Sequence, residues 1–250
     1  MKKIFALMLA MMMVFSLAAC GNKEAADDIN AKSEGVMTYA EYAAAALDAE
    51  VVIEAYVQAT QSWWDNKITV YAQDKDGAYF LYEMACSEAD AAKLVPGTKI
   101  KVTGYKGEWA GEVEIMDATF EFAGDTKYIA EPVDATAWLG TDELIKHQNE
   151  LVTFKGMTVA PSTDANGNEV AFLYNWDGSG AEGTDSDLYF NVSLNDQTYN
   201  FVVEYYLCNE TTDVYKAVQN LKIGDKIDLE GFLYWYEGVN PHITSVTAAK

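Results

Sequence analysis

The residues best suited to bind a ligand are aromatic side chains that gather in turn-like stretches. Five of the six tryptophans lie in two kinds of loop, and one of them is flanked by tyrosines. Flat aromatic faces stack on sugars, nucleic-acid bases or apolar side chains. The same rings could instead fill the ends of a domain or pack two domains together, and the sequence leaves both readings open. The candidate binding residues are Trp63, Trp64, Trp109, Trp176, Tyr234, Trp235 and Tyr236.

Residue patterns typical of catalysis or metal binding are absent from the sequence. It has no phosphate-binding loop, no Gly-x-Ser-x-Gly elbow and no cysteine–histidine spacing of a metal centre. Residues 164–169 loosely resemble a calcium loop, but the glycine falls one position early, and turn chemistry accounts for them. We therefore expect no catalytic residues, no metal and no cofactor. A hydrolase whose acids are hidden among the 39 Asp and Glu residues is the alternative.

The charge balance argues against nucleic acid as a partner. The formal net charge is −22, and all 17 basic residues are lysines. Proteins that bind nucleic acid present a basic stripe to phosphate and use arginine to read or stack on bases. A surface this acidic repels phosphate and keeps an exported protein soluble.

A duplicated stretch sets the architecture. Residues 93–120 and 220–248 align through Gly97 with Gly224 and Gly104 with Gly231. Each copy contains a turn, a strand that alternates apolar and polar residues, an aromatic loop and a closing strand.

The remaining segments complete two copies of one plan. The first copy has expected strands at 50–58, 67–73 and 78–86, and the second at 150–160, 187–194 and 199–208. Short helices are expected at 87–94 and 212–221, before the duplicated strands, and lead-in helices within 38–48 and 134–149. Residues 161–186 form an insertion, either a functional loop or an extra hairpin.

This element order resembles the OB-fold, a five-stranded barrel with a helix between strands 3 and 4. We therefore expect a mainly β chain with two tandem OB-fold-like barrels, at residues 37–123 and 134–250, and a linker at 124–133. The resemblance implies that the aromatic loops, between strands 1 and 2 and between strands 4 and 5, flank ligand grooves. Because adjacent strand residues point to opposite sides, one ring of the Trp63–Trp64 pair should face the core and the other a ligand.

Two cysteines end the third strand of each copy. Cys86 and Cys208 follow apolar runs and precede polar helix starts, so we expect both to be small buried hydrophobes. A disulfide between them would have to bridge the two domains.

The N-terminus indicates export and anchoring. Two lysines precede a 16-residue apolar run, which is shorter than the ~20 residues that span a bilayer. The run ends in Leu17-Ala18-Ala19-Cys20, which resembles the lipobox of bacterial lipoproteins. The resemblance implies a signal peptide at 1–19, acyl chains such as palmitate on Cys20, and a flexible tether at 20–36. An ordinary signal peptide that happens to contain a cysteine is the alternative.

These patterns together predict a lipid-anchored protein on the outer side of the cell membrane. We expect a non-catalytic binding or adaptor module whose ligand is a glycan or a protein. A structural spacer of the cell envelope is the first alternative, and an unrecognised hydrolase is the second.

Overall fold

The computed structural model describes residue 29 and residues 31–249. The expected signal peptide and the lipidation site Cys20 lie outside these residues. None of the helices within the described part of the chain is long and apolar enough to cross a membrane.

The first copy folds into a closed barrel with the strand order β1-β2-β3-β5-β4. All its strand pairs are antiparallel except β3 and β5, which pair in parallel through Phe80 with Glu114 and Leu81 with Ile115. The lead-in helix α1 begins at a capping box formed by Thr38 and Glu41, and Ser87 caps the short helix α2. The elements are α1 (Tyr39–Ala44), β1 (Glu50–Thr60), β2 (Lys67–Gln73), β3 (Ala78–Ala85), α2 (Glu88–Ala91), β4 (Thr98–Trp109) and β5 (Glu112–Lys127).

The second copy forms a barrel with the same order. β7 pairs with both β11 and β13, which closes the ring β7-β11-β12-β14-β13, and β12 pairs with β14 in parallel. The expected fold is confirmed: the chain is mainly β, with two five-stranded barrels in the order of the OB-fold. The elements are β7 (Leu151–Ala160), β11 (Leu188–Leu194), β12 (Gln197–Val203), α3 (Asp213–Gln219), β13 (Lys226–Phe232) and β14 (His242–Ala248).

The aligned glycines mark the same structural position in both barrels. Gly104 and Gly231 lie at bulges where strand 4 pairs with strand 5. A Cβ on Gly104 would lie 2.8 Å from the carbonyl oxygen of Met116, and one on Gly231 would lie 2.2 Å from that of His242. Only glycine permits these close backbone approaches.

The second lead-in helix, the linker and the tether differ from what the sequence predicts. The second lead-in helix is replaced by strand β6 (Val133–Asp134) and two 3₁₀ turns, η1 (Thr136–Trp138) and η2 (Leu144–His147), because Gly140, at φ +75°, interrupts the helix. The first part of the expected linker 124–133 belongs to β5, which continues to Lys127.

The end of the expected tether is bound to the first barrel. Lys32 forms an ion pair with Asp74 at 2.5 Å and donates to the carbonyl of Glu54. The hydroxyl of Tyr56 donates to the carbonyl of Ile29 at 3.0 Å. The described residues of the stretch 20–36 are therefore held against the domain rather than free.

The insertion at 161–186 contains an extra hairpin. β8 (Ser162–Thr163) pairs with β9 (Glu169–Val170), and β10 (Leu173–Tyr174) extends the sheet beside β11. The Asp164 side chain closes the turn by accepting backbone N–H bonds from Asn166 and Asn168. The extra-hairpin reading of this insertion is therefore correct.

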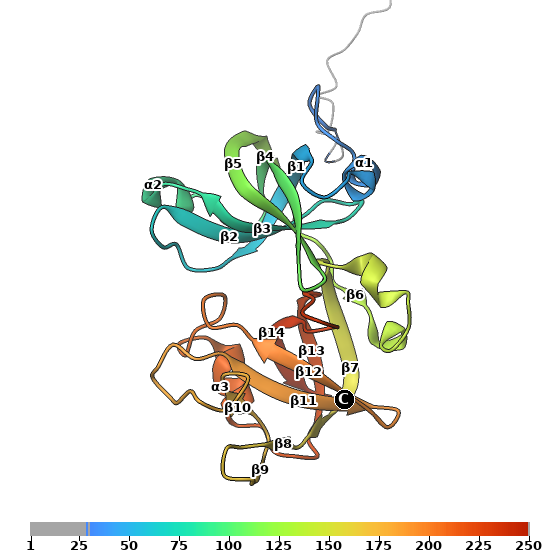
Figure 1. The fold of residues 1–250 in the computed structure, drawn as a ribbon, viewed down its shortest axis with the longest axis vertical. Helices are drawn as coiled ribbons and strands as arrows, with labels where there is room; N and C mark the ends of the chain where they lie inside the picture. Colours follow the sequence, from blue (N-terminus) through green and yellow to red (C-terminus); the bar gives the residue numbers. More distant parts are fainter. Residues whose placement is uncertain (1–28, 30, 250) are drawn as a thin grey trace, which may run out of the picture.

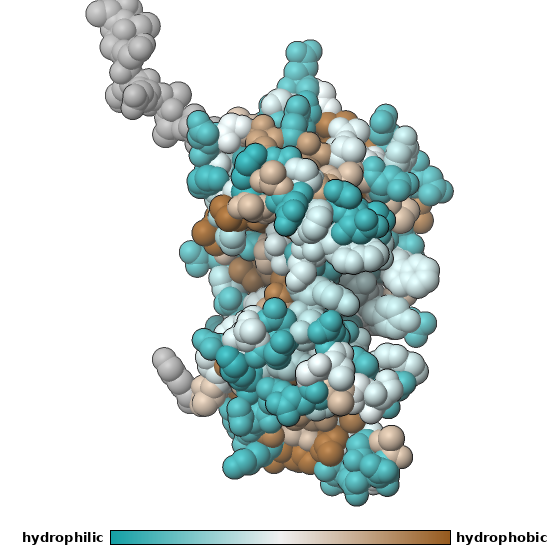
Figure 2. Space-filling view, turned by 90° about the vertical axis from the view of Figure 1, so that its left-hand side faces the viewer, coloured by the Kyte–Doolittle hydropathy of each residue, from teal (hydrophilic) through white to brown (hydrophobic). Residues whose placement is uncertain are grey.

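Each barrel has its own apolar core, and a third cluster joins the two. Cys86 and Cys208 are buried, as expected, and both are free thiols. The third cluster lies at the seam, which we define as the contact zone between the two barrels (Figure 1). On the face drawn in Figure 2, side chains of intermediate hydropathy, drawn in pale colours, gather around the middle of the molecule among hydrophilic side chains.

Candidate ligand-binding faces

The outer face of β2 and β3, where the OB-fold resemblance places a ligand, is closed in the first barrel. Tyr71 and Phe80 are opposite each other on these strands and point away from the barrel core. Tyr71 stacks on Phe232 of the second barrel with ring centroids 4.5 Å apart, and Phe80 meets the edge of Tyr234 at 5.2 Å. The second barrel therefore occupies the first barrel's groove, and Tyr234 packs the two copies together.

A buried histidine completes this aromatic cluster. His242 stacks on Tyr234 with centroids 4.1 Å apart, and its Nδ1 hydrogen-bonds with the hydroxyl of Tyr71 at 2.5 Å. Burial lowers the pKa of His242 to about 3, so the imidazole is neutral at neutral pH. The cluster thus encloses no charge from this residue.

Hydrogen bonds fasten the loop that joins β4 and β5 to the second barrel. Gln148 donates to the carbonyl of Gly111 at 2.8 Å and accepts from the backbone N–H of Val113 at 3.2 Å. Buried Glu112 accepts the N–H of Trp235 at 2.9 Å, and Glu237 donates its N–H to the carbonyl of Ala110 at 2.7 Å. Burial raises the pKa of Glu112 to about 9, so this side chain is a neutral acid at neutral pH.

The Trp63–Trp64 pair is split between the core and the surface. Trp63 is half-buried, packs on the first core and donates its Nε1–H to the carbonyl of Cys86 at 2.8 Å. Trp64 is 70% exposed. These orientations agree with the alternation expected from the sequence.

Replacing each ring of this pair by alanine should give different stabilities. We expect Trp63→Ala to cost roughly 2–3 kcal/mol, because it leaves a cavity and an unpaired carbonyl, although the ring is not fully buried. Trp64→Ala should change the free energy of unfolding by less than about 0.5 kcal/mol. Urea denaturation of both variants measures this, and equal losses would contradict the split.

The remaining candidate rings do not form one concave face. Trp109 is exposed at the end of β4, while Trp235 is half-buried against the second core and lies close to Gly111. Tyr236 is exposed beside this contact. Trp176, in the insertion, is 75% exposed. The structure therefore brings Trp235 to the seam and leaves Trp176 apart.

The equivalent outer face of the second barrel is open. When the hydrogen-bonded pair Asp74–Gly77 is counted as the first pair of its hairpin, Tyr71–Phe80 is the fourth pair from the turn, and Asn191–Asn200 is the fourth pair on β11 and β12. Asn200 is exposed and donates to the side-chain oxygen of Asn191 at 3.0 Å. From the loop after β13, Asn240 donates to the backbone oxygen of Asn200 at 3.0 Å.

Half-buried aromatic and hydroxyl side chains lie on the same side of β11 as Asn191. Tyr189 and Ser193 share the outward side of β11 with Asn191, since Leu188, Phe190 and Val192 fill the core. Burial and nearby Asp187 raise the pKa of Tyr189 to about 12, so its hydroxyl stays protonated. The alternation of apolar and polar residues in 187–194 could have identified these residues, but the prediction from the sequence considered only the aromatic residues of the loops.

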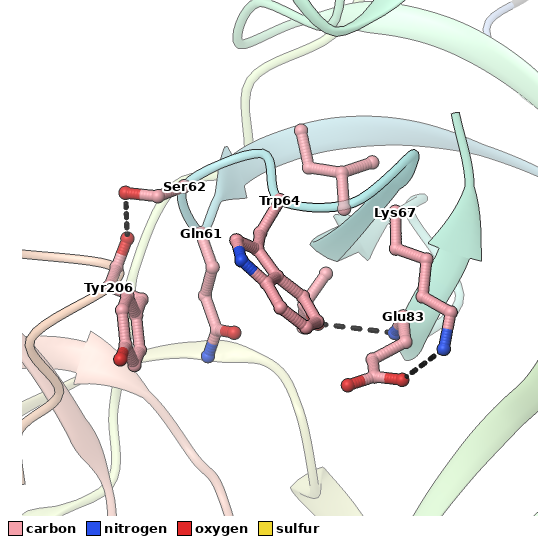
Figure 3. A pocket seen from close by; sticks show the side chains of 8 residues that line it. Gln61, Ser62, Trp64, Lys67, Glu83 and Tyr206 are labelled. Carbon is pink, nitrogen blue, oxygen red and sulfur yellow. Dashed lines mark hydrogen bonds and ion pairs between the residues drawn. The ribbon is translucent and has the colours of Figure 1, made fainter. Parts of the chain in front are cut away.

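A cavity of about 290 Å³ opens at the seam beside Trp64. Its lining includes Gln61, Ser62, Lys67 and Glu83 of the first barrel and Tyr206 of the second (Figure 3). Trp109 and Trp176 do not line it. Tyr206 was not among the predicted residues, because only the docking of the barrels brings it here.

Comparison with known proteins gives a distant likeness only. No protein-family model matches the chain, and no curated protein matches it. Among solved structures, the Ifi202 HINa domain in complex with 20-base-pair double-stranded DNA is 12% identical, with 81% of this chain and 100% of that chain covered and a TM-score of 0.36.

Two further solved structures are similar at the same level. The p202 HIN1 domain in complex with 12-mer double-stranded DNA is 11% identical, with 86% and 96% covered and a TM-score of 0.36. A replication protein A heterotrimer bound to single-stranded DNA is 12% identical, with 88% of this chain and 52% of that chain covered and a TM-score of 0.28. Likenesses this weak identify no family, and the fold assignment comes from the strand pairings above.

Proposed function

We propose that the protein is a non-catalytic, lipid-anchored binding module that takes a neutral, hydroxyl-rich polymer, such as a glycan, on the open face of its second barrel. One observation carries the proposal. The two barrels present equivalent faces, of which one is apolar and covered by the neighbouring barrel, and the other is rich in amides and open.

The chemistry of the open face suits sugar hydroxyls. Asn191, Asn200 and Asn240 are held in place by hydrogen bonds to one another and to the carbonyl of Pro161. Because an amide has two N–H groups and two acceptor positions, each keeps capacity for a hydroxyl group. Tyr189 adds a half-buried ring and a hydroxyl. Amides bind hydroxyl groups in both directions, whereas a carboxylate only accepts and an ammonium only donates. The outward positions of β11 and β12 carry no basic side chain. An anionic polymer would therefore find no counter-charge there.

The distant similarity to DNA complexes does not change this ligand class. The solved structures named above hold DNA, but this chain has a net charge of −22 and no arginine. Phosphate backbones bind through basic groups that release counterions. We therefore propose that nucleic acid is not a partner. The lipobox-like sequence at Cys20 supports a place on the outer side of the cell membrane.

A structural spacer is the second candidate. The buried aromatic cluster and the hydrogen bonds at the seam favour a rigid pair of barrels, as a spacer needs. A protein that only spaces would bind no polymer at the second barrel.

Loss of amides from the open face should weaken glycan binding. The test uses the full chain in detergent and neutral cello-, malto-, chito- and manno-oligosaccharides, measured by calorimetry. We expect Asn191→Ala with Asn200→Ala to weaken binding roughly tenfold or more, because two hydrogen-bonding groups are lost. Asn166→Ala, in the exposed turn of the β8–β9 hairpin, is the control. Wild-type binding by the double variant would contradict the proposed face, and binding of none of the sugars would favour the spacer.

A further inference from the structure

The cavity at the seam is built by both barrels together. Ser62, in the loop between β1 and β2, donates its backbone N–H to the carbonyl of Tyr206 at 2.8 Å, and its hydroxyl donates to the same oxygen at 3.3 Å. These bonds place the ring of Tyr206 on the same cavity as Trp64 (Figure 3). Neither barrel alone contains this arrangement.

The exposed indole of Trp64 is carried by a tight, hydrogen-bonded turn. Trp64 and Lys67 exchange backbone hydrogen bonds of 3.0 and 2.9 Å across a two-residue turn. Asp65 and Asn66, at φ +46° and +60°, have the left-handed conformations that such a hairpin turn requires. Because the backbone of this turn is already ordered, a ligand that stacks on the ring would cost the protein little backbone freedom on binding.

Apart from Ile68, the rest of the lining carries polar groups, and it has no net charge. Lys67 and Glu83 form an ion pair at 2.7 Å, and Gln61 adds an amide. An apolar ligand would cover these groups without hydrogen bonds, which is costly, and a charged ligand would meet both signs. A ligand ring with an apolar face and hydroxyl groups at its edge could stack on the indole and hydrogen-bond with the polar groups at the same time. The volume of about 290 Å³ lies at the small end of ligand pockets and suits one such ring.

We propose that this seam pocket is a second saccharide site, which holds one sugar ring of a neutral glycan on Trp64, with Tyr206, Gln61 and the Lys67–Glu83 pair around it. The proposal rests on the proposed function for the class of ligand. It adds a contact point on the first barrel, whose usual groove is closed. The docked pair of barrels is thereby a requirement of binding as well as of stability.

The test follows the indole signal of Trp64 directly. Full-length chain in detergent, labelled with ¹⁵N, is titrated with the methyl glycosides of glucose, mannose and N-acetylglucosamine. We expect the Trp64 Nε1–H resonance, assigned by its loss in Trp64→Ala, to shift with at least one of them. No shift of this resonance with any of the three would overturn the pocket, whatever happens at the second barrel.

Affinities for the oligosaccharides separate the two sites. We expect Trp64→Ala and Tyr206→Ala to weaken binding roughly 5- to 150-fold, the range measured for lost stacking rings. Trp176→Ala removes an equally exposed ring outside the cavity and should bind as wild type. If the Asn191→Ala, Asn200→Ala variant loses affinity while Trp64→Ala does not, the seam pocket is refuted and the proposed function stands. If Trp64→Ala loses affinity and the asparagine variant does not, the pocket is supported and the proposed face fails.

Discussion

Replacing Phe232 by alanine should lower the free energy of unfolding by about 3–5 kcal/mol, as is typical of a fully buried aromatic ring. The ring is 3% exposed and stacks on Tyr71 across the seam. Its removal leaves a cavity between two barrels that are held by hydrogen bonds on either side, so the site cannot collapse to refill it. This loss of stability measures how much the packing of the second barrel on the groove of the first contributes to folding.

Chemical denaturation of Phe232→Ala provides this value. Trp176→Ala is the matched control, because it deletes a larger ring that is 75% exposed, and it should change stability by less than about 0.5 kcal/mol. A loss below about 1 kcal/mol for Phe232→Ala would show that the barrels are not packed together in solution.

Replacing Glu112 by glutamine should abolish most of an alkaline loss of stability. Burial raises the pKa of Glu112 from 4.5 to about 9, so between these values the folded protein holds a proton that the unfolded chain has released. This contribution to stability is complete below pH 4.5 and is lost as the pH rises towards 9. The free energy of unfolding of the wild type should fall by about 1.4 kcal/mol per pH unit in this window. The variant should therefore become more stable than the wild type by several kcal/mol, relative to their difference at pH 4.5.

The neighbours of Glu112 shape the rest of the profile. Glu114 lies on the same side of β5, and burial raises its pKa as well. Burial also raises the pKa of Glu204 to about 7, which adds an alkaline loss that the glutamine variant retains. His242 acts in the opposite sense, because its lowered pKa removes stability as the pH falls below 6.5.

Melting temperatures of the wild type and Glu112→Gln across pH provide the comparison. The two curves should diverge steadily above pH 4.5. Parallel curves from pH 5 to 9 would mean that Glu112 is ionised in the folded protein, and its burial at the seam would then be wrong.

The fold could be predicted because its signals are local. Strand alternation, the Thr38–Glu41 capping box and the duplicated glycines each depend on a few neighbouring residues. The second lead-in helix was predicted wrongly because Gly140 interrupts a segment whose composition is otherwise helical.

The seam could not be derived in the same way, because it depends on how two complete barrels dock. Its only sequence signal is that β2 and β3 carry large apolar residues on both faces, as Tyr71 and Phe80 do opposite the core. The aromatic loops were correct candidates for exposed rings at Trp64, Trp109 and Trp176. Tyr234 follows the alternative, in which a ring packs the two domains together. Tyr206 reaches Trp64 only through the docking of the barrels.

The most direct test of the account is the response of the asparagine side chains to a glycan. The ¹⁵N-labelled chain is titrated with the neutral oligosaccharides and, in parallel, with single-stranded DNA at about 50 mM salt, where phosphate contacts are strongest. We expect the side-chain amide signals of Asn191 and Asn200 to shift with a saccharide, the backbone signal of Phe80 to stay in place, and DNA to change nothing. A shift at Phe80 with a saccharide, or shifts of the asparagine signals with DNA alone, would contradict the proposed binding face.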